Sequence, residues 1–130
     1  KQLGVSDNFY WIGPLYKDDK YNAMLSSDGY IMASDSEGFS MSIIDAMACS
    51  LPMILTSGCN MKYISDDKFY LMCEPYPQDL AHGIEYFLTH PQEMPMLGQK
   101  AKCVLEEKLY WDKIAHVMID NYQRIINTGD

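Results

Sequence analysis

The chain of 130 residues is poor in positive charge: ten Lys and Arg residues stand against 18 Asp and Glu residues, for a net charge of -8. A surface of this sign is unsuited to wrapping a nucleic-acid backbone or to lying on an anionic bilayer. We therefore expect no nucleic-acid partner and no electrostatic attachment to a membrane. A free nucleotide still qualifies as a ligand, because backbone amides can hold phosphate groups.

The sequence also lacks C-x-x-C spacing, a signal peptide and any apolar stretch near the roughly 20 residues of a membrane span. Its four cysteines stand in apolar surroundings, which predicts core residues of a reducing compartment, without disulfides or zinc. These are Cys49, Cys59, Cys73 and Cys103. The three histidines show no metal-ligand spacing, and we expect them on helix surfaces or at helix ends: His82, His90 and His116. The expected location is the cytoplasm, and no metal site is predicted.

No internal repeat, low-complexity tract or Gly/Ser linker interrupts the chain, so we expect residues 1–130 to form one domain. The sequence begins at Lys1 without Met and soon enters a strand-like run. We therefore expect a partial domain, cut from a longer protein.

Short apolar runs alternate with stretches of helical spacing. The runs predict strands at residues 8–13, 30–33, 53–56 and 69–73. The spacing predicts helices at residues 18–27, 40–50, 78–88, 93–109 and 111–127. In the first of these helices, Tyr21, Met24 and Leu25 form one stripe, which we expect to face the sheet. The pattern is typical of an α/β protein with a Rossmann-like parallel sheet, helices on both faces and several helices at the end.

The most informative segment is residues 34–52, which read SDSEGFSMSIIDAMACSLP. Ligands bind beyond the carboxyl ends of parallel strands, which is where the strand ending at Ala33 leads into this loop. We therefore expect Glu37 to face a crevice. The helix that starts near Ser40 would present unpaired amides suited to a diphosphate, and Gly38 would allow close approach. Asp45, in the second turn, could accept hydrogen bonds from a ribose diol.

This segment resembles the S-x-x-E-G-F-G-x-x-x-x-E-A-M-A-x-G-x-P motif of retaining glycosyltransferases of family 4. The resemblance implies that Glu37, the catalytic position, holds the donor sugar and that Asp45 holds the ribose. It places the diphosphate and sugar on the backbone of four consecutive residues: Gly38, Phe39, Ser40 and Met41. Two residues depart from the motif: Asp45 replaces Glu and is one methylene shorter, and Ser40 replaces Gly and adds a side chain where the donor passes.

Two further stretches resemble the family. Residues 56–60, Thr-Ser-Gly-Cys-Asn, are similar to a Thr-x-x-Cys-Asn stretch that shapes the pocket in some members, although Lys62-Tyr63 stands where Pro-Glu usually follows. The segment from Phe9 to Leu15 is similar to a strand and turn beside the nucleobase, which implies nucleobase contacts at Gly13 and Leu15. For that segment, a turn after a buried strand is an equally good interpretation.

The resemblance covers nearly the whole chain and implies the C-terminal donor-binding part of a two-domain GT-B enzyme. It implies a retaining, metal-independent hexosyltransferase whose donor is a nucleotide diphosphate-sugar and which needs no other cofactor. The acceptor, a sugar or a lipid-linked sugar, would bind mainly to the missing N-terminal domain, which would also provide any contact with the inner membrane surface. The isolated fragment should be inactive, and polysaccharide biosynthesis is the expected context. The alternative is a non-catalytic nucleotide-sugar binding or interaction module, because a fold alone does not fix a function.

Overall fold

A computed structural model describes residues 4–64 and 68–128 of the chain. The strands of these residues are β1 (Tyr30–Met32), β2 (Met53–Thr56) and β3 (Leu71–Cys73). The helices are α1 (Lys17–Leu25), α2 (Met41–Ala48), α3 (Pro77–Thr89), α4 (Met94–Lys108) and α5 (Trp111–Thr128), with short 3-10 helices η1 (Ser6–Asn8), η2 (Ser57–Cys59) and η3 (Met61–Tyr63). The strands form one parallel sheet in the order β1-β2-β3, so that Ile31 lies beside Ile54 and Ile54 beside Leu71. The predicted α/β fold is confirmed.

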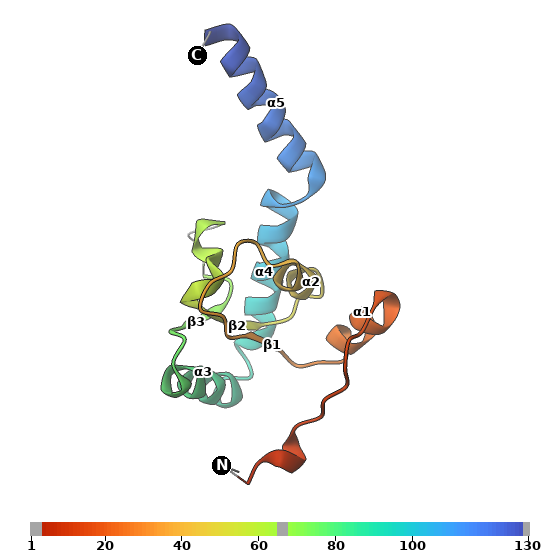
Figure 1. Cartoon of the computed structure of the whole chain (residues 1–130), viewed down its shortest axis with the longest axis vertical. Coiled ribbons are helices and arrows are strands. Elements are labelled where there is room, and N and C mark those ends of the chain that lie inside the picture. The colour runs from red at the N-terminus through yellow and green to blue at the C-terminus, as the bar shows by residue number, and fades with distance from the viewer. Residues whose placement is uncertain (1–3, 65–67, 129–130) are drawn as a thin grey trace.

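Helices cover both faces of this sheet. Helix α3 packs on β2 and β3, whereas α2 and α4 pack against each other on the opposite side (Figure 1). All four residues of the central strand β2 are buried. A strand covered on both faces needs apolar side chains at successive positions, which explains the uninterrupted Met-Ile-Leu run at its start.

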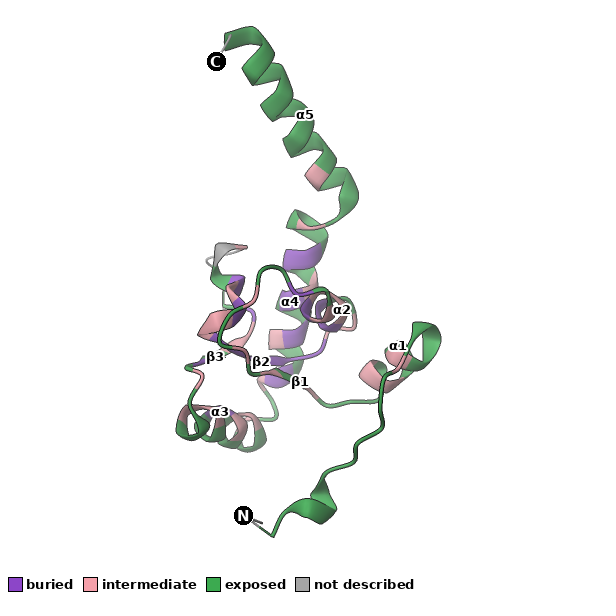
Figure 2. Ribbon diagram, in the orientation of Figure 1, coloured by how far each residue is buried: buried purple, intermediate pink, exposed green. Residues whose placement is uncertain are grey.

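The core lies between the sheet, α2 and α4 (Figure 2). Phe69, which precedes β3, is fully buried there, as are Ile43 and Met47 of α2. The other buried members of this core are Ala46, Leu51, Met53, Leu55, Cys59, Met61, Ala101, Val104 and Leu105. Burying this apolar surface holds α2, and therefore the loop before it, in a fixed position on the sheet.

Helix α2 ends in a tight turn that returns the chain to β2. The amide of Ser50 donates to Met47 O at 3.0 Å, and the amide of Leu51 donates to Ala46 O at 3.0 Å. These are the two hydrogen bonds of a Schellman motif, which places one residue in the left-handed region. Here that residue is Ser50, with φ 55°, where glycine would be free of the Cβ penalty.

The predicted strand at residues 8–13 is wrong. Those residues contain the end of η1 and extended chain without strand pairing, and Tyr10 and Trp11 are 84% and 95% exposed. An aromatic run forms a strand only when neighbouring strands accept its backbone hydrogen bonds. In the described residues, the sheet pairs β1 with β2 alone, so this segment has no strand beside it.

The predicted stripe on α1 is also wrong in part. Met24 packs against the core, but Tyr21 and Leu25 are exposed. Helix α1 lies beside the sheet edge at some distance from the layers that cover the sheet (Figure 1). Only part of its apolar surface is therefore in contact with the rest of the protein.

The structure also corrects the predicted burial of the cysteines. All four are free thiols: Cys59 and Cys73 are buried and Cys49 is half-buried, but Cys103 is exposed on α4. Cys103 lies on the side of α4 that faces solvent, whereas Ala101 and Val104, close to it in the sequence, lie on the buried side.

Helix α5 extends away from the rest of the protein and buries none of its residues (Figure 2). The predicted helical ending of the chain is thus confirmed, with α3, α4 and α5 following the last strand.

Candidate functional site

The candidate site lies at the carboxyl end of β1, where residues 33–40, the Glu37 loop, connect that strand to α2. Glu37 is half-buried, and its Oε1 accepts a hydrogen bond from Ser34 Oγ at 3.2 Å. Ligands of parallel α/β proteins bind at this edge of the sheet. Glu37 therefore lies at the edge of the sheet where such ligands bind, and its role stays a prediction.

The last residue of β2 and the connection that follows it hold the Glu37 loop at Ser34 and at Glu37. The hydroxyl of the buried Thr56 accepts from Ser34 N at 2.8 Å and donates to Ser34 O at 2.6 Å. The side chain of Asn60 donates to Glu37 O at 2.8 Å, and Glu37 N donates to Gly58 O at 2.8 Å. Residues 56–60 therefore fix the loop backbone at Ser34 and at Glu37 itself.

Gly58 is needed for this contact. A Cβ atom at Gly58 would overlap the carbonyl groups of Ser34 and Asp35, which are backbone atoms and cannot rotate away. Asn60 has φ 58°, in the left-handed region that Asn tolerates better than most residues. The sequence predicts a supporting role for residues 56–60. In the structure, these residues support the Glu37 loop by hydrogen bonds to its backbone and by the close approach at Gly58.

The start of α2 presents backbone amides beside the Glu37 loop. Its first helical hydrogen bond runs from Ile44 N to Ser40 O at 3.4 Å, which leaves the amides of Met41, Ser42 and Ile43 without an acceptor in the helix. Gly38 and Phe39, which precede the helix, are exposed to solvent. A helix start of this kind favours an anion, because the amides and the helix dipole both present positive charge.

The side chain of Ser40 does not point toward the exposed residues at the start of α2. Ser40 is only 8% exposed, and its hydroxyl lies 3.0 Å from Ser42 Oγ and 3.5 Å from Met32 Sδ. Tyr30 completes the group by donating to Ser42 Oγ at 2.8 Å, and burial raises the pKa of Tyr30. The side chain of Ser40 therefore points into the protein, toward Met32 and Ser42.

Asp45 lies in the second turn of α2, as predicted, and its side chain is 16% exposed. Its Oδ2 pairs with Lys20 Nζ at 2.6 Å, and its Oδ1 accepts from Tyr21 OH at 3.0 Å. The hydrogen bond to Asp45 raises the pKa of Lys20, so the ammonium form of Lys20 is favoured. The sequence did not predict these partners, which come from α1 and are more than 20 residues away from Asp45 along the chain.

Gly13 and Leu15, the predicted nucleobase residues, lie in the extended segment before α1. Gly13 has φ 72°, and a Cβ atom at this position would meet no other atom within 4 Å. Leu15 is half-buried, in contrast to the aromatic residues that precede it. The nucleobase role of these two residues stays a prediction.

The histidines lie on helix surfaces or at a helix end, as predicted. His82 is exposed on α3, His90 caps the end of α3 and stacks on Tyr86, and Nδ1 of His116 lies 2.6 Å from Asp112 O on α5. Residues 4–64 and 68–128 contain no cluster of His, Cys, Asp or Glu suited to a metal ion. Over the same residues, no helix combines the length and the apolar character needed to cross a bilayer.

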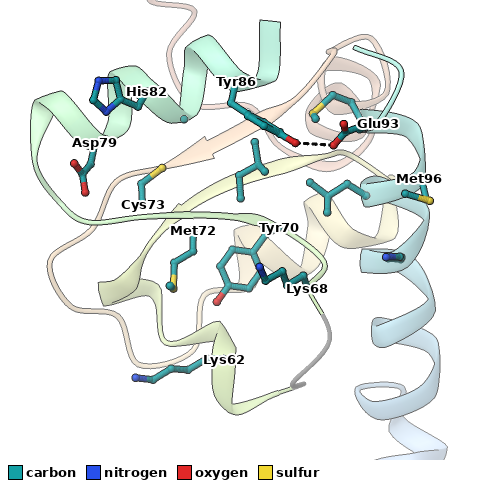
Figure 3. A pocket seen from close by; sticks show the side chains of 15 residues that line it. Lys62, Lys68, Tyr70, Met72, Cys73, Asp79, His82, Tyr86, Glu93 and Met96 are labelled. Atoms are coloured by element: carbon teal, nitrogen blue, oxygen red, sulfur yellow. Dashed lines mark hydrogen bonds between the residues drawn. The ribbon is translucent and has the colours of Figure 1, made fainter. Parts of the chain in front are cut away.

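A groove of about 920 Å³ lies elsewhere on the protein, between β3, α3 and the start of α4 (Figure 3). Met72 and Cys73 of β3 line it, and Tyr86 of α3 donates to Glu93 at 2.7 Å across one end. Lys62 and the other residues that line it belong neither to the Glu37 loop nor to α2. The candidate site and this groove are therefore separate features.

Solved structures share this fold. HepE of Anabaena, determined in complex with UDP, superimposes with a TM-score of 0.80 over 94% of this chain and 34% of its own, at 18% identity. The C-terminal domain of a glycosyl transferase group 1 family protein, LpcC of Francisella tularensis, superimposes with a TM-score of 0.70 over 83% of this chain and 57% of its own, at 20% identity. Likeness at these identities shows the fold alone, which is that of GT-B glycosyltransferases.

Comparison of sequences identifies the family as well as the fold. The D-inositol 3-phosphate glycosyltransferase of Paenarthrobacter aurescens (strain TC1) is 26% identical over 129 residues, which are 98% of this chain but 31% of that protein. The chain thus spans about a third of the length of this relative. The pattern of the family described as "Glycosyl transferases group 1" matches residues 1–104. This confirms the resemblance drawn from residues 34–52, and the chain belongs to the glycosyl transferases group 1 family.

Proposed function

We propose that this chain is the donor-binding part of a retaining glycosyltransferase, which moves a hexosyl group from a nucleotide diphosphate-sugar to an acceptor. The observation that carries the proposal is the arrangement around the start of α2. Glu37 precedes the first-turn amides of the helix, and Asp45 lies in the second turn of the same helix. A sugar, a diphosphate and a ribose follow one another in the same order in the donor.

Each group of the donor meets suitable chemistry in this arrangement. The ionised carboxylate of Glu37 is an acceptor for hydroxyl groups of the sugar. The amides from Gly38 through Met41 are donors for the diphosphate, whose charge increases as the sugar departs. Met41 begins α2, and an amide that the fold holds in place before the reaction stabilises the developing charge without reorganisation. Asp45 is the proposed acceptor for the ribose hydroxyls.

The remainder of the enzyme is proposed to lie in another part of a longer protein. The chain covers 31% of the Paenarthrobacter relative and 34% of HepE. We propose that the missing part forms an N-terminal domain which binds the acceptor and adds positive charge to the diphosphate. The isolated chain would then bind the donor weakly and would transfer no sugar.

The test is a calorimetric titration of the full-length protein with UDP-glucose, GDP-mannose and UDP. Asp45→Ala should weaken every ligand that binds the wild type, because each contains the ribose. Glu37→Ala should weaken only the ligands that contain a sugar. Glu85→Ala, on the exposed surface of α3, is the matched control and should change neither.

Two results would contradict the proposal. If the full-length protein binds none of these ligands, nor ADP-glucose, the sugar-nucleotide site is refuted. If it binds them with the expected pattern but neither transfers nor hydrolyses the sugar, the alternative of a non-catalytic binding module is favoured instead.

A further inference from the structure

Two residues of α1 hold the carboxylate of Asp45 from one side. Lys20 Nζ contacts Oδ2 at 2.6 Å, and Tyr21 OH contacts Oδ1 at 3.0 Å. The two residues also contact each other, because Lys20 Nζ lies 4.6 Å from the centre of the Tyr21 ring. Each oxygen of Asp45 is therefore bound by a different donor, and the plane of the carboxylate is fixed.

This arrangement leaves acceptor capacity on Asp45. An ionised carboxylate offers about four lone-pair positions, and the contacts from α1 use one on each oxygen. The side chain is 16% exposed, so the carboxylate is not sealed from solvent. Each oxygen therefore keeps a lone pair for a hydroxyl group of a ligand.

We propose that Lys20 and Tyr21 are positioning residues for nucleotide binding: they orient Asp45 toward the ribose diol of the donor. The inference rests on the proposed function, in which Asp45 accepts from the ribose. It adds α1 to the site and assigns a role to two residues that the motif of residues 34–52 does not contain. An Asp has one methylene less than a Glu and so reaches less far, which makes a fixed orientation more important here.

Lys20 has a second effect in this proposal, through its charge. Asp45 follows Met41 by four residues along α2, which is a rise of about 6 Å along the helix axis. A diphosphate at the helix start would therefore lie within a Debye length, about 8–10 Å, of a carboxylate of the same sign. The ammonium of Lys20 offsets that charge, so that the ribose acceptor and the diphosphate site can occupy one end of the same helix.

The position of α1 supports a role beyond packing. No residue of α1 is buried, and it is anchored to the rest of the protein through Met24 and these two contacts with Asp45. The pairing therefore adds little apolar burial. It holds α1 against α2 and also determines which way the Asp45 carboxylate points.

The experiment compares ribose and deoxyribose ligands on full-length variants. The ligand is the tightest binder among UDP, GDP and ADP, measured by calorimetry beside its 2′-deoxy and 3′-deoxy counterparts. Tyr21→Phe removes one orienting hydrogen bond without changing the ring, and we expect it to weaken the ribonucleotide by about fivefold, as for one net hydrogen bond. One of the two deoxy ligands lacks the hydroxyl that Asp45 would bind. Tyr21→Phe should weaken the binding of that ligand by less than about twofold.

Lys20→Met should reduce the same ribose preference and should also lower affinity more at low ionic strength than at high, because it removes a charge. Lys20→Arg keeps the charge and should therefore retain most of the ribose preference and most of the affinity. Tyr16→Phe and Lys17→Met are the controls: they lie at or near the start of the same helix and contact no carboxylate among the described residues.

The outcomes separate this inference from the function on which it rests. If Asp45→Ala abolishes the ribose preference but Tyr21→Phe and Lys20→Met retain it, the positioning role is overturned and the donor site stands. If Tyr21→Phe weakens ribose and deoxyribose ligands equally, its role is structural and the inference is again wrong. If wild type binds no nucleoside diphosphate, both the inference and the proposed function fail.

Discussion

Replacing Gly58 by Ala should damage the candidate site without touching any group that binds the donor. A Cβ atom at this position would overlap the carbonyl groups of Ser34 and Asp35, and the Glu37 loop must move to accommodate it. Overpacking of this kind typically destabilises a protein by about 1–3 kcal/mol. The shift also strains the hydrogen bonds that Glu37 N and Glu37 O make with Gly58 and Asn60, both of 2.8 Å.

The effect on binding follows from the displacement of Glu37. Hydrogen bonds to a charged acceptor contribute roughly 1.5–3 kcal/mol, so a misplaced Glu37 should weaken a sugar nucleotide by about ten- to a hundredfold. The nucleoside diphosphate without its sugar should lose much less. Calorimetry with UDP-glucose and UDP, or with the guanosine pair if that is the ligand, measures the two affinities directly.

Gly98→Ala provides the matched control for this prediction. A Cβ atom at Gly98 would overlap the backbone of Ser50, at the opposite end of α2 from the Glu37 loop. This variant should be destabilised in denaturant unfolding to a similar extent as Gly58→Ala, yet should bind sugar nucleotides with unchanged affinity. Wild-type affinity in Gly58→Ala, or an equal loss of binding in both variants, would show that Gly58 does not position Glu37.

Three further predictions concern single residues. Ser50→Gly should stabilise the protein by about 1 kcal/mol, because Ser50 has φ 55° and glycine avoids the cost of a Cβ in the left-handed region; a lower midpoint in denaturant would contradict this. Ser40→Gly should not improve donor affinity in calorimetry, since the Ser40 hydroxyl points toward Met32 and not toward the helix start; tighter binding would show that the side chain obstructs the donor. Cys103 should react first with maleimide, as judged by peptide mass spectrometry, because it is exposed. Burial raises the pKa of the Cys49 thiol, so its labelling should stay slow at neutral pH and accelerate as pH rises past the ordinary thiol value, whereas equal labelling of both would refute this assignment.

The elements nearest the site could be predicted from sequence because their signals are local. The strand Met53–Thr56 follows from a run of apolar residues after Pro52, and the helix before it from apolar spacing that ends at Ser50. Both are held by burial on the side that the spacing indicates. The local sequence pattern and the tertiary packing favour the same structure there, and under this condition secondary structure can be predicted from the sequence.

The interpretation failed where the deciding contacts were distant. The aromatic run from Phe9 to Ile12 has strand propensity, but no strand of the described residues pairs with it. Spacing places Tyr21 in an apolar stripe, whereas its hydroxyl binds Asp45, 24 residues away. Helical periodicity states which residues share a face, and it does not state which partner that face meets.

The supporting role of residues 56–60 was foreseen only in outline. Their resemblance to a family stretch indicated a part in the pocket, but the reason lies in the approach of two loops. Thr56 and Asn60 bind the backbone of Ser34 and Glu37, and Gly58 leaves room for them to meet. Because this contact joins the ends of neighbouring strands, it becomes visible only once the strand order is known.

A crystal structure of the full-length protein with its nucleoside diphosphate bound would show directly whether the donor lies at the start of α2. We predict the diphosphate on the backbone amides between Gly38 and Met41, and a ribose hydroxyl within hydrogen-bond distance of Asp45. Density for the nucleotide in the groove between β3, α3 and α4, or at any place remote from the start of α2, would contradict the account.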